Sequence, residues 1–323
     1  MISVIVCHRD PALFEQFKSS LSATIGVDYE LICIDNSRNN YTIFEAYNEG
    51  VKRAKGKILC FSHEDIIFHT LDWGKNVLKH FEDDRIGMIG VAGGNCFPYS
   101  PSFWWSDSSF NNHLINLLQR WPTKSPKQKY HYNLDDKGYF TIAYNNPSGE
   151  TSVRAAVVDG LWFCIRRTLF DHIRFDEETY NGFHCYDTDI SLQVNEHAMV
   201  CVVYDVLVEH LSDANANKQF FDSCIKHFDK WKDKLPLIYR KNYNQDELDR
   251  YLVNAILEFA YSMKSNAFYS DSEIREVIRN CLRGLKLQHR PKEFYLLWLW
   301  GLLGYNLAPY PYFLIRKLYS DGA

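Results

Sequence analysis

The stretch GKILCFSHEDIIF (residues 56–68) joins an apolar run directly to three ionisable side chains. Residues 58–61 are all apolar, which is typical of a short strand buried on both faces. Side chains of an extended backbone alternate between its two sides, so we expect His63 and Asp65 on one side and Glu64 on the other. An imidazole beside a carboxylate could hold a divalent cation. The alternative is a turn that Asp65 caps while His63 packs against an aromatic ring.

The chain around this stretch alternates short apolar runs with segments of helical spacing. Asp10 and Pro11 provide an N-cap and a first-turn proline for one helix, and Gly56 provides the C-terminal stop of another. The expected strands are residues 2–7, 31–34, 58–61, 86–91, 157–165 and 200–208, and a further helix is expected over 188–198. This order predicts an α/β fold in which helices flank an open, mostly parallel sheet.

Two segments depart from the alternation. Residues 94–150 mix Pro, Ser, Asn, Trp and Lys without a period, and we expect an irregular insertion of loops with at most one helix. Residues 213–323 consist largely of charged segments with helical character. We therefore expect an α/β domain over residues 1–212, which contains the insertion, and a C-terminal helical region over residues 213–323.

Composition excludes several classes of function. The chain has 323 residues, 46% of them hydrophobic, so it can bury a sizeable core. A formal net charge of −4 provides no cationic field for nucleic acid, and no such partner is expected. Nine cysteines without a Cys-x-x-Cys pair predict reduced thiols and no zinc site. The first residues carry no basic signal-peptide segment, and the expected location is the cytoplasm.

Polar side chains follow four of the expected strands. They are His8 and Arg9, Asp35 and Asn36, His63 to Asp65, and His210. Ligands of open parallel sheets bind beyond the carboxyl ends of the strands, so we expect these side chains at one edge. His63 and Asp65, with His210 completing the set, offer imidazole and oxygen ligands that suit Mn²⁺ or Mg²⁺.

Six segments occur in an order that is typical of one enzyme family. They are ISVIVCHRD, YELICIDNS, AYNEGVKRAKGKILCFSHEDI, VVDGLWFCIRR, YDTDISLQV and VVYDVLVEHLS. Together they resemble the glycosyltransferases of the GT-A fold, family 2 type, including a bacterial branch that has H-x-D in place of the usual D-x-D. The resemblance covers residues 1–212 and implies the GT-A fold for them.

The resemblance implies a donor site at the predicted edge. Asp35 matches the carboxylate that faces the nucleotide base, and His8 and Arg9 lie in the loop that forms the other wall of that pocket. Asp65 matches the carboxylate that binds the metal on the donor diphosphate. His63 stands where a first Asp usually stands, on ribose or metal, and His210 matches a histidine that joins the metal in some members.

The resemblance also implies a catalytic base and an acceptor side. Asp187 matches the base, although the family often has Glu or Asp where this chain has Tyr186. The residues themselves leave a second role open, because Asp187 or Asp189 could cap the helix that follows. The acceptor-side candidates are Asp159, Gly160, Asp189, Trp104 and Trp105, the last two as rings on which a sugar could stack.

The function implied is metal-dependent transfer of a sugar, with inversion, from a nucleotide-diphosphate donor. A UDP-sugar is favoured, and the acceptor is a hydroxyl of a glycan or lipid-linked saccharide in bacterial surface polysaccharide synthesis. One alternative is a nucleotide-sugar-binding protein that has lost turnover, because His63 and Tyr186 depart from the family pattern. A metal-dependent hydrolase built on His63, Asp65 and His210 is a further alternative.

The C-terminal residues 294–315 contain no charge but several aromatic residues. Trp298, Trp300, Tyr310 and Tyr312 lie there, flanked by Arg290, Lys292, Arg316 and Lys317. This composition could place the segment on the inner face of the cytoplasmic membrane as a peripheral contact. The alternative is a helix docked on the catalytic domain.

Overall fold

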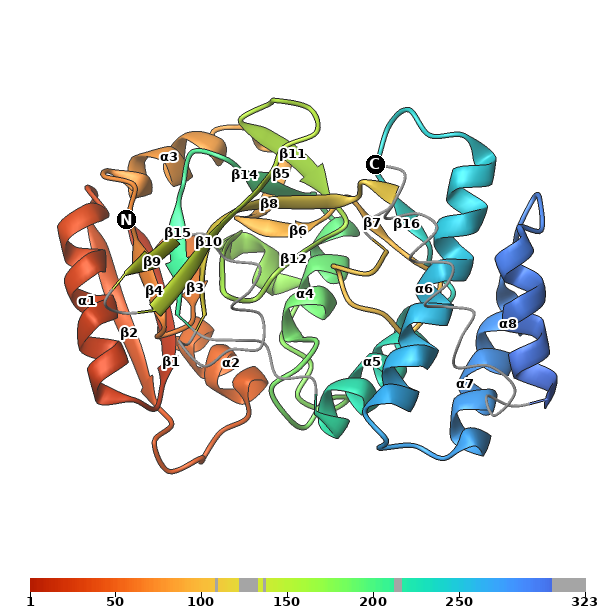
Figure 1. The fold of residues 1–323 in the computed structure, drawn as a ribbon. Helices are drawn as coiled ribbons and strands as arrows, with labels where there is room; N and C mark the ends of the chain where they lie inside the picture. The colour runs from red at the N-terminus through yellow and green to blue at the C-terminus, as the bar shows by residue number, and fades with distance from the viewer. Residues whose placement is uncertain (108–109, 122–132, 136–137, 212–216, 304–323) are drawn as a thin grey trace. The chain divides into compact units, whose positions relative to one another are not determined.

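A computed structural model describes residues 1–107, 110–121, 133–135, 138–211 and 217–303 of the chain (Figure 1). The chain divides into two compact units. The first comprises Met1–Cys96 and His113–Asn215, and the second comprises Phe97–Asn112 and Ala216–Ala323. All nine cysteines are free thiols.

The first unit contains a seven-stranded sheet with the order β11-β14-β5-β13-β3-β1-β2. Its strands are β1 (Ile2–His8), β2 (Tyr29–Asp35), β3 (Ile58–Ser62), β5 (Ile86–Gly90), β11 (Ser152–Ala155), β13 (Trp162–Arg166) and β14 (Met199–Val203). The strands β1, β2 and β3 pair in parallel, whereas β13 runs antiparallel to both β3 and β5. The α/β fold class is confirmed, with a sheet that is mixed.

The described part of this unit contains four α-helices, and their starts follow from local sequence. They are α1 (Pro11–Thr24), α2 (Ile43–Arg53), α3 (Trp73–His80) and α4 (Tyr186–Asn195), with a 3₁₀ turn at Arg167–Asp171. The Asp10 carboxylate accepts hydrogen bonds from the first backbone N–H groups of α1, as the sequence predicts. Thr42 and Glu45 form a capping box at the start of α2.

The connections of the first three strands create a switch point. From β1 the chain moves outward through α1 to β2, and then back through α2 to β3 on the other side of β1. Right-handed crossovers in opposite directions place α1 and α2 on opposite faces of the sheet. The loops after β1 and β2 therefore diverge, and a crevice opens at the carboxyl ends of these strands.

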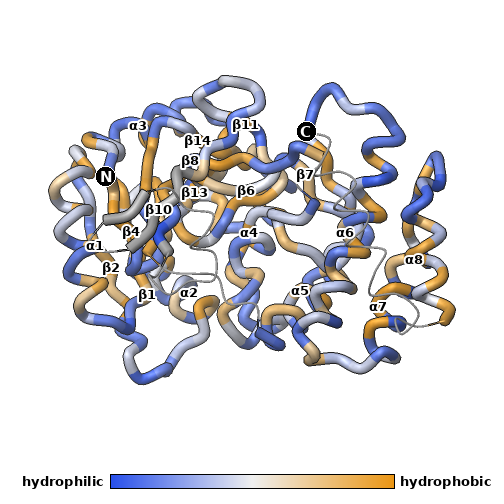
Figure 2. Tube along the Cα trace, in the orientation of Figure 1, coloured by the Kyte–Doolittle hydropathy of each residue, from blue (hydrophilic) through white to orange (hydrophobic). Residues whose placement is uncertain are grey.

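The core of the first unit is a cluster of aromatic rings between β3 and its helices. Phe61 is fully buried, with ring centroids 5.0 Å from Tyr47, 5.2 Å from Phe163 and 5.0 Å from Phe175. In Figure 2 the strands of this unit are largely hydrophobic, while its helices alternate hydrophobic and hydrophilic residues. Burial of one face of each helix against the sheet holds the strand ends in fixed positions.

A second sheet occupies the region that the sequence predicts to be irregular. It has the order β12-β6-β8-β10-β9, and β15 pairs with both β4 and β8. Its strands are β4 (Ile66–Phe68), β6 (Ala92–Gly94), β8 (His113–Trp121), β9 (Asn133–Asp135), β10 (Gly138–Asn145), β12 (Val157–Val158) and β15 (Val208–His210). The expectation of loops and at most one helix over residues 94–150 is therefore wrong. The strands β8 and β10 pair with one another antiparallel, a long-range pairing that a local search for period does not detect.

Two expected strands are each divided in the structure. Residues 157–165 break at Asp159 and Gly160, so β12 lies in the second sheet and β13 in the first. Residues 200–208 divide into β14 in the first sheet and β15 in the second. Each break moves the chain from one sheet to the other, which apolar runs alone do not reveal.

The second unit is mainly helical. Its described helices are α5 (Lys218–Trp231), α6 (Gln245–Ser265), α7 (Asp271–Gly284) and α8 (Lys292–Leu303). Two short strands, β7 (Cys96–Phe97) and β16 (Leu237–Ile238), pair with one another. Capping boxes start α6 at Asn244 and α7 at Ser270. Phe110 stacks on Tyr251 at 4.5 Å, which ties residues 97–112 to α6.

The described residues include the first part of the predicted membrane segment, residues 294–303. Trp298 and Trp300 lie on α8, whereas Tyr310, Tyr312, Arg316 and Lys317 lie outside the described residues. In the described part of the chain, no helix combines the length and the apolar character needed to cross a bilayer.

We predict that Phe61→Ala lowers the free energy of unfolding of the first unit by about 3–5 kcal/mol, because it leaves a cavity among Tyr47, Phe163 and Phe175. Leu71→Ala is the control, since Leu71 is 74% exposed and its loss is expected to change stability by less than about 0.5 kcal/mol. Urea unfolding followed by tryptophan fluorescence measures both variants. Equal midpoints for the two would contradict this account of the core.

Candidate functional site

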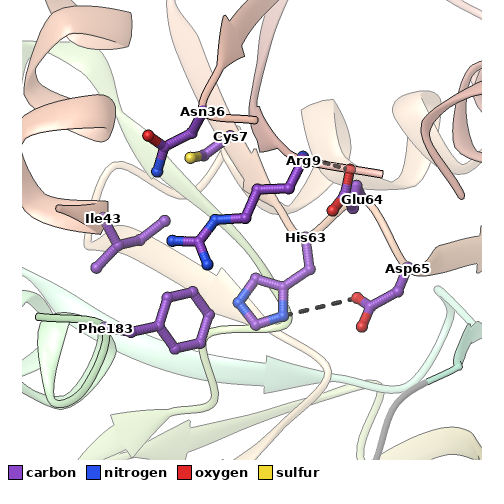
Figure 3. Close-up of a pocket in the computed structure, with 8 residues that line it drawn as sticks. All are labelled: Cys7, Arg9, Asn36, Ile43, His63, Glu64, Asp65 and Phe183. Carbon is purple, nitrogen blue, oxygen red and sulfur yellow. Dashed lines mark hydrogen bonds and ion pairs between the residues drawn. The ribbon is translucent and has the colours of Figure 1, made fainter. Parts of the chain in front are cut away.

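A pocket opens at the carboxyl ends of β1, β2 and β3. Its volume is about 180 Å³, and it is lined by Cys7, Arg9, Asn36, Ile43, His63, Glu64, Asp65 and Phe183 (Figure 3). Cys7 and Arg9 come from the end of β1, Asn36 from the end of β2, and His63 to Asp65 from the end of β3. The pocket therefore lies at the switch point of the sheet, where the strand order predicts ligand binding.

His63, Asp65 and His210 converge beside this pocket. His63 Nδ1 lies 3.8 Å from Asp65 Oδ1, and His210 Nε2 lies 3.6 Å from Asp65 Oδ2. One ligand atom from each residue lies within 4.8 Å of the other two. Asp65 thus stands between two imidazoles, and the three side chains are mostly buried.

Backbone pairing accounts for the position of His210. Strand β15 runs antiparallel to β4, so His210 lies opposite Ile66, the residue after Asp65. The pairing continues past the strand, where Leu211 N–H donates to the Asp65 carbonyl oxygen at 2.9 Å. Glu209, which neighbours His210 on β15, is buried and forms ion pairs with His69 and Arg120.

Each imidazole has a further partner on its second nitrogen. His63 Nε2 lies 2.6 Å from the Tyr186 hydroxyl, and His210 Nδ1 lies 3.1 Å from Gln119 Oε1. These bonds leave His63 Nδ1 and His210 Nε2 directed at Asp65. Burial lowers the pKa of His63, which favours the neutral imidazole that a metal requires.

Glu64 points away from His63 and Asp65, as the alternation of an extended chain predicts. Its carboxylate accepts hydrogen bonds from the backbone N–H groups of Arg9 at 2.9 Å and Asp10 at 3.1 Å. This contact ties the loop after β1 to the loop after β3. The Arg9 side chain extends across the pocket toward Phe183 (Figure 3). Of the residues that line the pocket, Arg9 is the one whose side chain carries a permanent positive charge.

Asp187 lies at the start of α4, next to Tyr186. Its Oδ2 accepts a hydrogen bond from Gly160 N–H at 2.9 Å, and its Oδ1 accepts one from Thr188 N–H at 2.8 Å. The carboxylate therefore satisfies one N–H group in the first turn of α4, although the N-cap position itself is Cys185, and it also binds the Asp159–Gly160 turn. Burial, together with the charge of Asp159, raises the pKa of Asp187 to about 7.

The absence of a side chain at Gly160 makes room for the Tyr186 ring. A Cβ atom at Gly160 would lie 2.0 Å from the Tyr186 hydroxyl oxygen, so no side chain fits there without displacing the tyrosine. The preceding Asp159 accepts a hydrogen bond from Leu161 N–H at 2.9 Å. The turn that separates β12 from β13 therefore binds Asp187 directly through Gly160 N–H. It also contacts Tyr186, whose hydroxyl is the partner of His63.

The other predicted residues have different surroundings. His8 stacks on Phe14 with centroids 4.0 Å apart. Asp35, paired with His8 in the β1–β2 register, is exposed and accepts from Ser37 N–H, while its neighbour Asn36 lines the pocket. Asp189 is 1% exposed.

Asp189 is held within the core of the first unit. It accepts hydrogen bonds from the Tyr180 hydroxyl at 3.2 Å and from Gln193 Nε2 at 2.7 Å. Burial removes it from contact with an acceptor, so we leave it out of the proposed site. Trp104 and Trp105 belong to the second unit, where Trp105 stacks on Phe103 at 4.7 Å, and their acceptor role stays a prediction.

Some residues of the site were not predicted from the sequence. Gln119 lies on β8, within the segment expected to be irregular, and only the pairing of β8 with β15 brings it to His210. Phe183 is 44% exposed and lines the pocket from the loop before α4. The run NGFHC before the YDTD motif marks that loop, but nothing in it indicates where the ring points.

The donor atoms of the three converging residues fit a divalent cation. Two neutral imidazoles and a carboxylate form a mixed nitrogen and oxygen set, which suits Mn²⁺ and related ions. Tyr186 and Gln119 supply the outer hydrogen bonds that orient ligating histidines in metal sites.

Comparison with known proteins gives the family and the fold of the chain. A sequence model of the family described as "Glycosyltransferase like family" matches residues 3–234. Residues 1–349 of S. aureus TarS have a TM-score of 0.50 and 12% identity, over 88% of this chain and 80% of that chain. The same protein in complex with UDP-GlcNAc gives a TM-score of 0.49 and 12% identity, over 88% and 81% of the two chains.

GalNAc-T7 with UDP, GalNAc and Mn²⁺ gives a TM-score of 0.47 and 11% identity, over 87% of this chain and 54% of that chain, so this chain spans about half of its length. No curated protein matches the chain. The likeness to TarS concerns the fold, which is the GT-A fold expected from the sequence. Because the family model matches more than half of the residues, the chain belongs to the glycosyltransferase-like family.

Proposed function

We propose that the protein is a metal-dependent, inverting glycosyltransferase that uses a nucleotide-diphosphate sugar. The observation that carries the proposal is the convergence of His63, Asp65 and His210 beside a pocket at the switch point of the sheet, in a member of this family. A UDP-sugar is the favoured donor. The proposed acceptor is a hydroxyl of a glycan or lipid-linked saccharide in bacterial surface polysaccharide synthesis.

The donor is proposed to bind in the pocket with its diphosphate toward Asp65. Mn²⁺ or Mg²⁺ held by His63, Asp65 and His210 would supply the Lewis acid that neutralises the leaving diphosphate. Arg9, which also lines the pocket, adds a positive charge. Guanidinium groups bind phosphate oxygens with short, charge-assisted hydrogen bonds. His8 and Asp35, at the adjacent ends of β1 and β2, are proposed to contact the nucleoside.

Asp187 is proposed to act as the general base. The acceptor oxygen forms a bond to the anomeric carbon while the bond from that carbon to the diphosphate oxygen breaks. The hydroxyl proton passes to a carboxylate oxygen of Asp187. With a pKa of about 7, this carboxylate is ionised in part of the molecules at neutral pH and is basic enough to take the proton. The turn at Asp159 and Gly160 holds the base and is proposed to border the acceptor.

The alternatives account less well for the site. The residues that depart from the family pattern, His63 and Tyr186, are joined by a hydrogen bond of 2.6 Å. A protein that has lost turnover would have no functional reason to keep two substituted residues in contact. A two-metal hydrolase requires a second group of ligands. Within the described residues, His63, Asp65 and His210 form the one such group of three.

Asp187→Asn is expected to lower the rate of transfer by about 10²–10⁴-fold, because the amide cannot accept the proton. Nucleotide affinity is expected to stay unchanged, since the substitution leaves the pocket residues in place. Asp171→Asn, an exposed aspartate on the 3₁₀ turn, serves as the control. A native transfer rate in Asp187→Asn would show that another group takes the proton.

The pH dependence of transfer follows from the same carboxylate. Only the ionised form of Asp187 can accept a proton, and its pKa is raised to about 7. We therefore expect the single-turnover rate to rise with pH, about tenfold per unit below pH 7, and to level off above it. A rate that is constant from pH 5.5 to 8.5 (about 1.5 units on each side of that pKa) is incompatible with Asp187 as the base.

Asp65→Asn is expected to abolish metal-dependent nucleotide binding. Thermal-shift titration of UDP, GDP and dTDP, each with Mn²⁺, Mg²⁺ or EDTA, measures this, because a ligand at 100 times its Kd stabilises the fold by about 2.7 kcal/mol. The native protein should show a nucleotide-selective shift that needs the metal. A shift of equal size in Asp65→Asn, or no shift with any nucleotide at millimolar concentration, contradicts the proposed donor site.

Tyr186→Phe is expected to weaken Mn²⁺ binding by about 10–100-fold, because it removes the hydroxyl that orients His63 while keeping the buried ring. Titration calorimetry measures the affinity. Tyr180→Phe is the matched control, since its hydroxyl binds Asp189 and not a proposed ligand. The same Mn²⁺ affinity in both variants would mean that Tyr186 does not position His63.

A further inference from the structure

Helix α8 presents a row of large apolar side chains to solvent. The row, which we term the α8 stripe, consists of Tyr295, Trp298, Leu299, Leu302 and Leu303, and each member is between 44% and 61% exposed. Their spacing of three and four residues places them on one side of the helix. Figure 2 shows α8 as largely hydrophobic. An exposed row of this kind is rare on a surface that faces only water.

The opposite side of α8 is fixed to the second unit. Leu297 and Trp300 are buried, and the helix packs against α6 and α7. Gly301 is buried next to Ile278 of α7, and its carbonyl accepts a hydrogen bond from Arg279 Nε at 2.8 Å. The sequence suggests a membrane contact for both Trp298 and Trp300. In the structure only Trp298 is exposed, because Trp300 belongs to the packed side. The stripe therefore lies on a helix whose other side is packed against the second unit.

Positive charge is concentrated in the segment of the chain that contains the stripe. Between residues 279 and 303 the basic residues are Arg279, Arg283, Lys286, Arg290 and Lys292, and all five are exposed. The single acidic residue of this segment is Glu293, which is buried. The chain as a whole has a formal net charge of −4, so this segment has the opposite sign to the rest of the protein.

We infer that the α8 stripe and its basic residues form a docking surface for an anionic lipid bilayer. Trp and Tyr side chains are favoured at the membrane interface, leucine enters the acyl region, and Lys and Arg bind lipid phosphates. Because the other side of α8 packs against α6 and α7, the helix can meet a bilayer only with the stripe and is expected to lie in the plane of the interface.

A second copy of the chain fits this surface less well. A two-fold symmetric contact through the stripe would bring together two copies of a positively charged segment that has no exposed acid between residues 279 and 303. Bilayer docking through α8 does not depend on the chemistry of the proposed donor site. It does agree with a lipid-linked acceptor, which is itself part of the proposed function.

Vesicle flotation of the full chain tests the inference. The vesicles contain phosphatidylcholine, with or without phosphatidylglycerol. We expect the native protein to float with the anionic vesicles and to be released by salt, and to bind the neutral vesicles far more weakly. Trp298→Ser/Leu302→Ser should weaken partitioning by about tenfold or more. Arg283→Glu/Lys286→Glu should weaken it by about 25-fold or more, as each basic residue contributes about fivefold.

A control variant distinguishes the α8 stripe from exposed rings elsewhere on the second unit. Phe268→Ser removes a 41% exposed ring of the same unit and should float like the native protein. The far-ultraviolet circular dichroism of every variant should be native, because the altered side chains are exposed. Absence of native binding to anionic vesicles overturns the inference. Unchanged binding in both double variants also overturns it, as does binding that is lost only when residues 304–323 are deleted. A dimer that Trp298→Ser/Leu302→Ser dissociates, in a protein that binds no lipid, would show that the stripe contacts a second copy instead.

Discussion

The antiparallel pairing of β15 with β4 is the contact on which the proposed site depends. It places His210 opposite Ile66 and extends to the hydrogen bond from Leu211 N–H to the Asp65 carbonyl. Residues near positions 65 and 210 are thus held as close as neighbouring strands of a sheet, although they are far apart in the chain. If this pairing shifted by one residue, His210 would point to the opposite face and Glu209 would take its place. The ion pairs of Glu209 with His69 and Arg120 oppose such a shift.

The site also has to satisfy buried polar groups. Two imidazoles and a carboxylate taken out of water cost stability unless their atoms find partners. Tyr186 and Gln119 provide these partners on the outer nitrogens, and they direct the inner nitrogens at Asp65. Tyr186 in turn fits because residue 160 is a glycine, and Gly160 N–H binds Asp187. The proposed metal site and the proposed base are therefore linked through one turn and one tyrosine.

The sequence predicted the part of the fold that local patterns encode. The strands β1, β2 and β3 are short apolar runs with a capped helix or a glycine between them, so their positions, their parallel pairing and the edge at which they end could be predicted. The alternation that separates Glu64 from His63 and Asp65 could also be predicted, because it depends only on an extended backbone. The fold class follows from this order.

The rest depends on long-range pairing. Strands β8 and β10 are recognisable as strands only through each other and through β15, and Gln119 reaches His210 by this route. Whether Asp35 or Asn36 faces the pocket depends on the exact end of β2, and the burial of Asp189 depends on the position of Tyr180. The exposed and packed sides of α8 could not be distinguished either, because both are apolar in sequence.

The most direct test of the central claim is electron spin echo spectroscopy of Mn²⁺ added to the native protein and to His210→Gln. Modulation from imidazole ¹⁴N in the native protein, reduced in His210→Gln, is the result that the account predicts. Addition of UDP should then add a ³¹P coupling from the diphosphate. Mn²⁺ that shows no ¹⁴N modulation, or the same modulation in both proteins, would contradict the claim that strand pairing brings His210 to a metal site with Asp65.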